Sequence, residues 1–229
     1  MKISIIIPVY NEEKIIAKTI SYLKTHGDIN VCDIIVVDGG STDATVLKAQ
    51  EAGATVYTSP EKGRAEQMNF GVTKAKGDIF YFVHADTTPP ITYALDIIDA
   101  VKEGYSSGCY RLKLDSTKKL FFINEWFTRF DKMWCRGGDQ TLFATKELFQ
   151  KLNGFDRYYV IMEEYDFIVK ARKISKFKIF KKSTIASARK YESNSWLSVM
   201  IANYKAYKMF SKNIEPQKIK EYYKSAIKL

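Results

Sequence analysis

The sequence predicts an α/β fold in which a mostly parallel central sheet is flanked by helices. Three observations predict it: short apolar runs rich in β-branched residues recur through the first 90 residues, strand and helix patterns alternate four times, and the connections are short. A continuous apolar run is typical of a strand that is covered on both faces. At 229 residues, the chain is long enough for one large domain with an appendage.

The first strand is predicted at residues 3–9. The helix after it carries Ile16, Ile20 and Leu23 at helical spacing. Asn11 lies between the two elements and is well placed to cap the N-terminus of that helix.

The next two strands are predicted at residues 34–37 and 55–58, and residues 63–76 can form a helix after them. The fourth strand, at residues 79–83, is a run of five apolar residues that ends abruptly at His84. This alternation is typical of a parallel sheet with helices on both faces.

Polar side chains follow two of these strands at the point where each strand ends. Asp38 closes the second strand, and His84 and Asp86 follow the fourth. Because the carboxyl ends of parallel strands face the ligand crevice, we expect these residues at the edge of a binding site. The sequence has neither a dinucleotide-binding fingerprint nor a P-loop, and carboxylates would repel a bare phosphate unless a divalent cation lay between them.

Beyond residue 103 the pattern is less regular. Residues 108–114 alternate like a half-exposed strand, and residues 119–134 form a long, aromatic-rich helical stretch. A polar loop follows, in which Arg136, Asp139 and Gln140 flank two glycines. A loop of this composition is suited to contact with a ligand.

Three carboxylates lie within four residues at the predicted start of a helix: Glu163, Glu164 and Asp166. Acidic side chains in a first turn interact favourably with the helix dipole, which is the structural interpretation of this cluster. Three acids in four residues nevertheless exceed what capping requires.

The net charge of +10 is concentrated near the C-terminus. Residues 170–229 hold 16 lysines and arginines against 3 glutamates, whereas residues 1–169 hold 20 against 23 acids, so the two parts carry +13 and −3. This asymmetry indicates an anionic partner surface, either acidic lipid or nucleic acid, although a solvated basic face is the commoner cause. Because no nucleic-acid-binding motif is present, we expect no nucleic-acid partner.

The tail, residues 191–229, is predicted to be a basic, aromatic helical extension of a domain formed by residues 1–190. Four of its aromatic and apolar residues recur at helical spacing and would form a stripe on one face of a helix: Trp196, Met200, Tyr204 and Tyr207. An aromatic stripe bordered by lysines fits an interfacial helix, which would rest on an anionic membrane. Stripes of this kind more often pack on their own domain.

We expect a cytoplasmic protein, with peripheral contact at the inner face of the membrane as an option for the tail. No apolar run reaches the length of a transmembrane helix, and the apolar N-terminal segment is too short, and broken too early by Pro8, for a signal peptide. Cys32, Cys109 and Cys135 have the spacing of neither a disulfide framework nor a zinc site.

Several short motifs are spread over roughly residues 1–190. Four of them are P-V-Y-N-E (8–12), V-D-G-G-S-T-D (37–43), A-K-G-D-I-F-Y-F-V-H-A-D (75–86) and N-G-F-D with E-E-Y-D (153–166). Together they resemble family 2 glycosyltransferases of the GT-A fold, which implies a GT-A type, Rossmann-like sheet. Three more are similar to the radical-SAM/selenodomain-associated, arsenosugar-type subgroup: G-R-A-E-Q-M-N-F-G (63–71), H-A-D-T-T-P-P (84–90) and G-D-Q (138–140).

The resemblance implies a nucleoside-diphosphate sugar as donor. In the family, the loop after the first strand and the acid after the second hold the nucleotide, so Pro8, Tyr10, Glu12 and Asp38 would surround a uridine-like base and its ribose. Four further residues are candidate contacts to the diphosphate or the acceptor, although each could instead form a surface salt bridge or hydrogen bond: Arg64, Arg136, Asp139 and Gln140.

A divalent metal, Mn²⁺ or Mg²⁺, is the cofactor that the resemblance implies. The family's Asp-Xaa-Asp motif holds it on the diphosphate, and this chain departs from the motif because His84 stands at the first position. Asp86 is therefore the surer ligand. Histidine binds Mn²⁺ more readily than Mg²⁺, so the identity of the metal is open.

The family's Glu-Asp pair supplies the catalytic base, and here the pair is Glu163-Glu164. The resemblance thus gives the role to Glu164, with Asp166 as a second candidate. Transfer with inversion needs one carboxylate to take the proton of the acceptor hydroxyl and needs no acid for a diphosphate leaving group. The acceptor is open between a small metabolite, which suits the subgroup, and a lipid-linked molecule, which suits the tail.

Two other functions compete with glycosyl transfer. A nucleotidyltransferase also uses carboxylate-bound metal on an α/β sheet, but would be expected to have a glycine-rich, basic loop where this chain has Tyr10-Asn11-Glu12-Glu13. A membrane-surface scaffold with a degenerate catalytic domain would explain His84 and Glu164 in unusual positions. Both substitutions are chemically conservative, however, and favour an active transferase.

Overall fold

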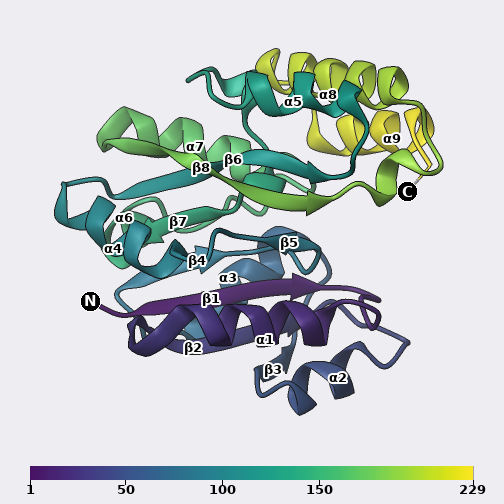
Figure 1. The fold of residues 1–229 in the computed structure, drawn as a ribbon. Coiled ribbons are helices and arrows are strands. Elements are labelled where there is room, and N and C mark those ends of the chain that lie inside the picture. Colours follow the sequence, from purple (N-terminus) through teal and green to yellow (C-terminus); the bar gives the residue numbers. More distant parts are fainter. Residues whose placement is uncertain (229) are drawn as a thin grey trace.

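An eight-stranded sheet runs through the computed structural model, which describes residues 1–228 (Figure 1). Its strands are β1 (Ile3–Val9), β2 (Val31–Asp38), β3 (Thr55–Thr58), β4 (Ile79–Phe82), β5 (Thr87–Thr88), β6 (Ser107–Asp115), β7 (Leu142–Thr145) and β8 (Phe177–Ser187). They lie in the order β3-β2-β1-β4-β7-β6-β8-β5. The first four pair in parallel, and β7 joins them to the rest through antiparallel pairing with β4 and β6. The predicted mostly parallel core of the sheet is therefore confirmed.

Helices connect and cover the strands. They are α1 (Ile16–Gly27), α2 (Thr45–Glu51), α3 (Arg64–Lys74), α4 (Tyr93–Lys102), α5 (Phe122–Phe127), α6 (Lys146–Lys151), α7 (Glu163–Ile174), α8 (Trp196–Ser211) and α9 (Pro216–Ala226). Within residues 1–228, no helix combines the length and the hydrophobicity needed to cross a bilayer.

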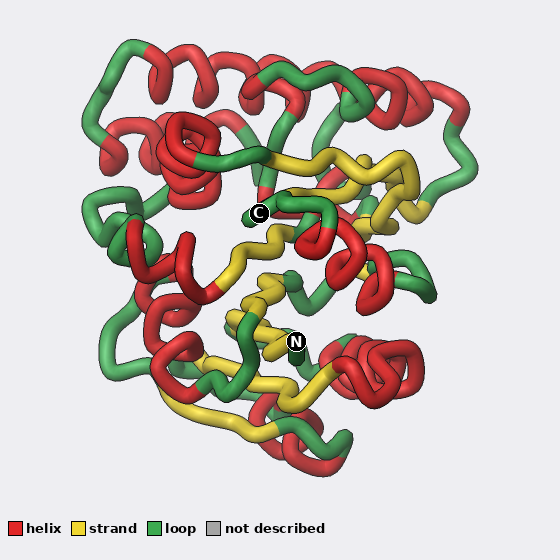
Figure 2. The backbone as a smooth tube through the Cα atoms, turned by 90° about the vertical axis from the view of Figure 1, so that its left-hand side faces the viewer, coloured by secondary structure: helices red, strands yellow, loops and turns green. Residues whose placement is uncertain are grey.

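The sheet buries both of its faces, as the continuous apolar strands predict. Side chains alternate along β1, so Ile5 packs with α1 and α4 on one face, whereas Ile6 packs with α3, α6 and α7 on the other. Figure 2 shows the helices on both sides of the strands. The carboxyl ends of β1 and β4 lie at an edge of the sheet that these helices do not cover, so residues there can line a binding site.

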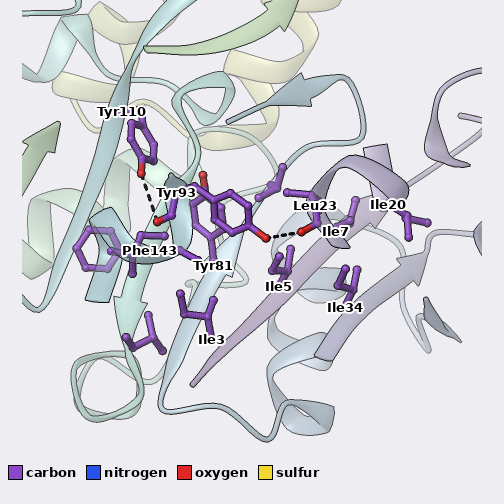
Figure 3. Packing of buried hydrophobic residues seen from close by; sticks show 14 of the residues in the cluster. Ile3, Ile5, Ile7, Ile20, Leu23, Ile34, Tyr81, Tyr93, Tyr110 and Phe143 are labelled. Carbon is purple, nitrogen blue, oxygen red and sulfur yellow. Dashed lines mark hydrogen bonds between the residues drawn. The ribbon is translucent and has the colours of Figure 1, made fainter. Parts of the chain in front are cut away.

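Three buried tyrosines join the central strands to the helices of one face (Figure 3). The Tyr93 hydroxyl donates to the main-chain carbonyl of Leu23 at 2.7 Å, and its ring stacks on Tyr81 with centroids 5.5 Å apart. The Tyr110 hydroxyl donates to the Tyr93 carbonyl at 3.4 Å. A buried hydroxyl needs such a partner, so these bonds fix α4 against α1 and β6.

The expected long helix at residues 119–134 is wrong in its extent. A 3-10 turn at Lys119–Phe121 leads into α5, which ends at Phe127. The chain bends after α5 because the buried Arg136 guanidinium donates hydrogen bonds to the main-chain carbonyls of Thr128 and Phe130. These carbonyls therefore do not continue a helix.

The predicted cap at Asn11 is also wrong, because α1 begins four residues later than that role requires. Asn11 has a left-handed backbone, with φ of 54°. Its amide oxygen accepts the N–H of Thr42 at 2.9 Å, and its own N–H donates to Ser41 Oγ at 2.8 Å. The residue thus ties together the loops that follow β1 and β2.

The C-terminal extension forms α8 and α9, which pack on each other at the upper end of the molecule in Figure 1. The buried positions of α8 are Val199, Ala202 and Ala206 rather than the predicted aromatic stripe. Two small residues on this face let α9 approach closely. Of the stripe, Trp196 is half-buried and donates from Nε1 to Asn124 Oδ1 at 2.9 Å. The domain boundary at residue 190 stays a prediction.

Gly71 offers a test of how tightly α3 lies on the sheet. A Cβ atom there would lie 2.7 Å from Ile6 Cγ2 and 3.0 Å from Val37 Cγ2. Helix propensity alone favours alanine by about 1 kcal/mol, but overpacking costs about 1–3 kcal/mol, so we expect Gly71→Ala to lower the free energy of unfolding. Urea denaturation measures it, with exposed Thr73→Ala on the same helix as the control, expected within about 0.5 kcal/mol of wild type. A stabilised Gly71→Ala variant would contradict this packing.

Candidate active site

A cavity of about 1060 Å³ opens at the carboxyl ends of β1 and β4. Its wall continues over the loop before β7, the first turn of α7, the 3-10 turn after β8, and parts of α8 and α9. Eleven of the thirteen predicted site residues line it: Pro8, Tyr10, Glu12, Arg64, His84, Asp86, Arg136, Asp139, Gln140, Glu163 and Glu164. Asp38 and Asp166 are not part of this wall.

Two adjacent carboxylates are buried at the start of α7. Glu163 and Glu164 are 2% and 6% exposed, and the residue before them, Met162, has a left-handed φ of 67° that turns the chain into the helix. Arg64, at the first position of α3, faces both carboxylates. Its Nε lies 3.2 Å from Glu163 Oε1, and its Nη1 lies 3.7 Å from Glu164 Oε1.

The two carboxyl groups differ in their affinity for a proton. Burial and the charge of Glu164 raise the pKa of Glu163 above its usual range, although Arg64 opposes this. Burial also raises the pKa of Glu164, but the cations of Arg64 and His84 outweigh it, and the net pKa of Glu164 is lowered. Glu164 is therefore the ionised member of the pair and the one suited to accept a proton.

His84 lies between two carboxylates of the cavity wall. Its Nε2 is 3.2 Å from Glu164 Oε1, and its Nδ1 is 3.5 Å from Asp139 Oδ1. Burial disfavours the imidazolium, but hydrogen bonds to Asp139 and Glu164 outweigh burial and raise the pKa of His84 to about 9. In this arrangement the protonated ring links the loop before β7 to α7. A metal ligand at this position would need the neutral form.

Gly138 is required for this contact. A Cβ atom at residue 138 would lie 2.5 Å from both Glu164 Oε1 and His84 Cε1. No side chain fits there unless the two groups separate.

Asp86 faces the cavity next to an ion pair between two distant parts of the chain. The guanidinium of Arg189, in the turn after β8, binds both carboxylate oxygens of Glu12, and its Nη2 lies 3.5 Å from Asp86 Oδ2. Burial and the charge of Asp139 raise the pKa of Asp86, and the cations of His84 and Arg189 oppose this without reversing it. Negative charge at Asp86 is thus only partly compensated, and a cation would fit there.

Asp38 is buried behind the loop that follows β2. Its carboxylate accepts the N–H groups of Gly40 and Ser41 at 3.0–3.1 Å, which holds that loop in shape. Gln67 supports the neighbouring strand ends, since its Nε2 donates to the carbonyls of Val9 and Val37. A nucleotide contact by Asp38 stays a prediction.

Three other predicted residues use their side chains within the fold. Asp166 points away from the cavity and pairs with Lys170 at 2.7 Å. Arg136 is 3% exposed and binds main-chain carbonyls, and Gln140 donates to the Cys135 carbonyl at 2.8 Å. Arg136 and Gln140 thus support the shape of the wall. Because Asp166 lies outside the wall, Glu164 is the better candidate base by position.

Sequence reasoning missed Arg189, Lys190 and Gln67, which also line the cavity. Arg189 and Lys190 follow the end of β8, so the rule applied to the other strand ends would have found them. Within residues 1–228, no three His, Cys, Asp or Glu side chains are arranged to hold a metal ion by themselves.

Comparison with known proteins gives the family. The model of glycosyl transferase family 2 matches residues 4–182. The protein RfbJ of Shigella flexneri is 39% identical over 97 residues, which are 42% of this chain and 74% of that protein.

Solved structures agree on the fold. The mannosyltransferase PcManGT of Pyrobaculum calidifontis, in complex with GDP-Man and Mn²⁺, has a TM-score of 0.72 at 17% identity over 93% of this chain and 64% of that one. TarS of S. aureus, residues 1–349 with UDP-GlcNAc, has a TM-score of 0.68 at 18% identity over 88% and 66%. The chain thus spans just under two thirds of both solved chains. By its sequence and with a GT-A type fold, the chain belongs to glycosyl transferase family 2.

Proposed function

We propose that this chain is an inverting glycosyltransferase that moves a sugar from a nucleoside-diphosphate sugar to an acceptor hydroxyl, with the help of a divalent metal ion. The observation that carries the proposal is a single cavity wall on which the ionised Glu164 and the partly compensated Asp86 both lie. Membership of the family supports the reaction class. UDP is our first choice of nucleotide, and GDP is the alternative, because the two solved structures named above hold one of each.

The donor would lie against the loop after β1. Tyr10 is 59% exposed and lines the cavity beside Pro8, so its ring is free to stack on a base. Glu12 and Arg189 form the polar part of this wall. Arg64 is a further candidate contact for the diphosphate.

Asp86 would hold Mn²⁺ or Mg²⁺. His84 is a second candidate ligand only in its neutral form, because the protonated ring pairs with Glu164 and Asp139 instead. The partly compensated charge at Asp86 fits a cation. Too few protein groups converge to coordinate it fully, so water and donor oxygens would complete the coordination. When bound, the ion neutralises the charge that develops on the leaving diphosphate.

Glu164 would act as the general base. As the acceptor oxygen attacks the anomeric carbon, its proton moves to a Glu164 carboxylate oxygen. The bond from the anomeric carbon to the diphosphate oxygen breaks, and its electron pair leaves with the nucleoside diphosphate, which inverts the anomeric configuration. Arg64 and His84 keep Glu164 ionised and in position.

Two finer proposals favour different acceptors, a small metabolite in one case and a lipid-linked molecule in the other. Similarity to the arsenosugar-type subgroup supports a metabolite. Peripheral contact with an anionic membrane would support a lipid, and we propose it from exposed apolar residues on two neighbouring helices: Phe122, Ile123 and Trp126 of α5, and Leu197, Ile201 and Tyr204 of α8. These helices lie side by side in Figure 1, and lysines of α8 border them.

Donor binding tests the metal proposal. We expect calorimetry to show that Mn²⁺ strengthens UDP binding, and that Asp86→Ala removes this gain and weakens binding by about tenfold or more, because the ion loses its protein ligand. GDP is titrated in parallel, and the exposed Asp99→Ala on α4 is the control. Affinity for both nucleotides that is independent of Mn²⁺, or unchanged in Asp86→Ala, would contradict the proposal.

The base is tested by turnover. In slow hydrolysis of UDP-glucose, where water replaces the acceptor, we expect Glu164→Gln to lower kcat by about 10²- to 10⁴-fold, because the amide accepts no proton. Donor affinity should stay near that of wild type. Asp166→Asn is the matched comparison and should retain most activity. If Asp166→Asn loses kcat as Glu164→Gln does, with donor binding intact, the base has been misassigned.

Membrane contact is tested with point substitutions, because the tail lines the cavity and its deletion would disturb the site. We expect co-sedimentation with phosphatidylglycerol vesicles and little with phosphatidylcholine, since lysines border the apolar face. The double variant Phe122→Ser, Leu197→Ser, on α5 and α8 and outside the cavity wall, should lose most of this binding. The exposed Leu47→Ser on α2 should keep it. Equal binding by both variants, or none by wild type, would remove the membrane from the proposal.

A further inference from the structure

The C-terminal wall of the cavity is cationic. Five lysines from the turn after β8, from α8 and from α9 line it: Lys190, Lys205, Lys208, Lys220 and Lys224. The two of α8 are three residues apart and the two of α9 are four apart, so each helix presents its pair on one face. All five lysines therefore line the same cavity although they come from three elements.

Lys190 is attracted to Asp139, and although burial opposes this, the negative charge of Asp139 raises the pKa of the lysine. The four lysines of α8 and α9 have no such partner: among residues 1–228, none of these four has a carboxylate oxygen within 4.0 Å, whereas Lys218 on α9 pairs with Glu215 at 3.5 Å. Lys208 Nζ lies 5.5 Å from the Tyr204 ring centroid, and Lys205 Nζ lies 6.0 Å from that of Tyr222. The carboxylates of the opposite wall are occupied by Arg64, His84 and Arg189.

Like charges gathered in one concave region repel each other and attract an anion. We do not assign the lysines to the donor, because the groups proposed above for its diphosphate are Arg64 and a metal ion at Asp86, which lie on other elements of the cavity wall. Several lysine ammonium groups suit a phosphate dianion, which accepts charge-assisted hydrogen bonds from each. The apolar side chains of Met200, Ile201 and Trp134 line the same cavity and would accommodate a carbon skeleton.

We propose that the acceptor carries a phosphate group, which the lysines of α8 and α9 bind while its hydroxyl faces Glu164. This inference rests on the proposed glycosyl transfer and specifies its acceptor class. The phosphate could belong to a soluble phosphorylated metabolite or to a phospholipid headgroup, and the chemistry of recognition is the same for both.

The test measures binding of glycerol 3-phosphate, with glycerol as its uncharged match, to the full-length protein with and without saturating UDP and Mn²⁺. We expect glycerol 3-phosphate alone to bind, and the variant with Lys205, Lys208, Lys220 and Lys224 all changed to glutamine to bind at least about tenfold more weakly. Lys205, Lys208 and Lys224 are exposed and Lys220 is half-buried, and unchanged UDP binding checks that the variant is folded. Lys212→Gln, at the end of α8 and outside the cavity wall, is the matched control.

A second arm identifies the source of the phosphate. Vesicles that contain phosphatidic acid, compared with phosphatidylcholine alone, replace glycerol 3-phosphate. Lysine-dependent binding of either probe supports the proposal and names the source. The proposal is overturned if neither probe binds, if the quadruple variant binds as Lys212→Gln does, or if UDP displaces glycerol 3-phosphate, which would assign the anion to the donor half. Failure of the donor-binding experiment, in contrast, would count against glycosyl transfer itself.

Discussion

The compensation of two buried carboxylates by one guanidinium is the interaction on which the rest of the site depends. Glu163 and Glu164 are adjacent, nearly inaccessible to water and at the N-terminus of a helix, where the helix dipole favours negative charge. Without the charge of Arg64, burial and mutual repulsion would both disfavour two ionised carboxylates at this place. Because Arg64 begins α3 and the glutamates begin α7, this contact also fixes the helices that cover one face of the sheet.

The sheet explains why charges from distant parts of the chain meet. Parallel strands β1 and β4 end at the same edge of the sheet. Their apolar side chains are buried in the hydrophobic cores on its two faces. Polar residues that follow such strands have no place in the core and project into the open volume. The turn after β8 reaches the same volume from the other side, so Arg189 meets Glu12 across 177 residues of sequence.

Much of this arrangement could be predicted from the sequence, for a physical reason. Strands buried on both faces leave an unmistakable apolar run, and the residue that ends such a run is confined to one edge of the sheet, which is how His84 and Asp86 were found. The sequence does not reveal which partner a polar atom takes. The sequence therefore predicts a nucleotide contact for Asp38 and makes Asp166 a second candidate base beside Glu164. In the fold, the Asp38 oxygens accept main-chain N–H groups of a loop, and Asp166 pairs with Lys170.

The close packing at Gly138 limits which substitutions the cavity wall can accept. Its missing side chain lets His84 touch Glu164, so even one added methyl group would have to separate them. The lysines of α8 and α9 have no such restriction, because they project from exposed helix faces. The wall therefore has a sterically restricted part around Gly138, where we place the proposed chemistry, and a part on α8 and α9 whose side chains can be replaced with less effect on packing. An altered substrate range could evolve, or be engineered, in the second part while the first stays fixed.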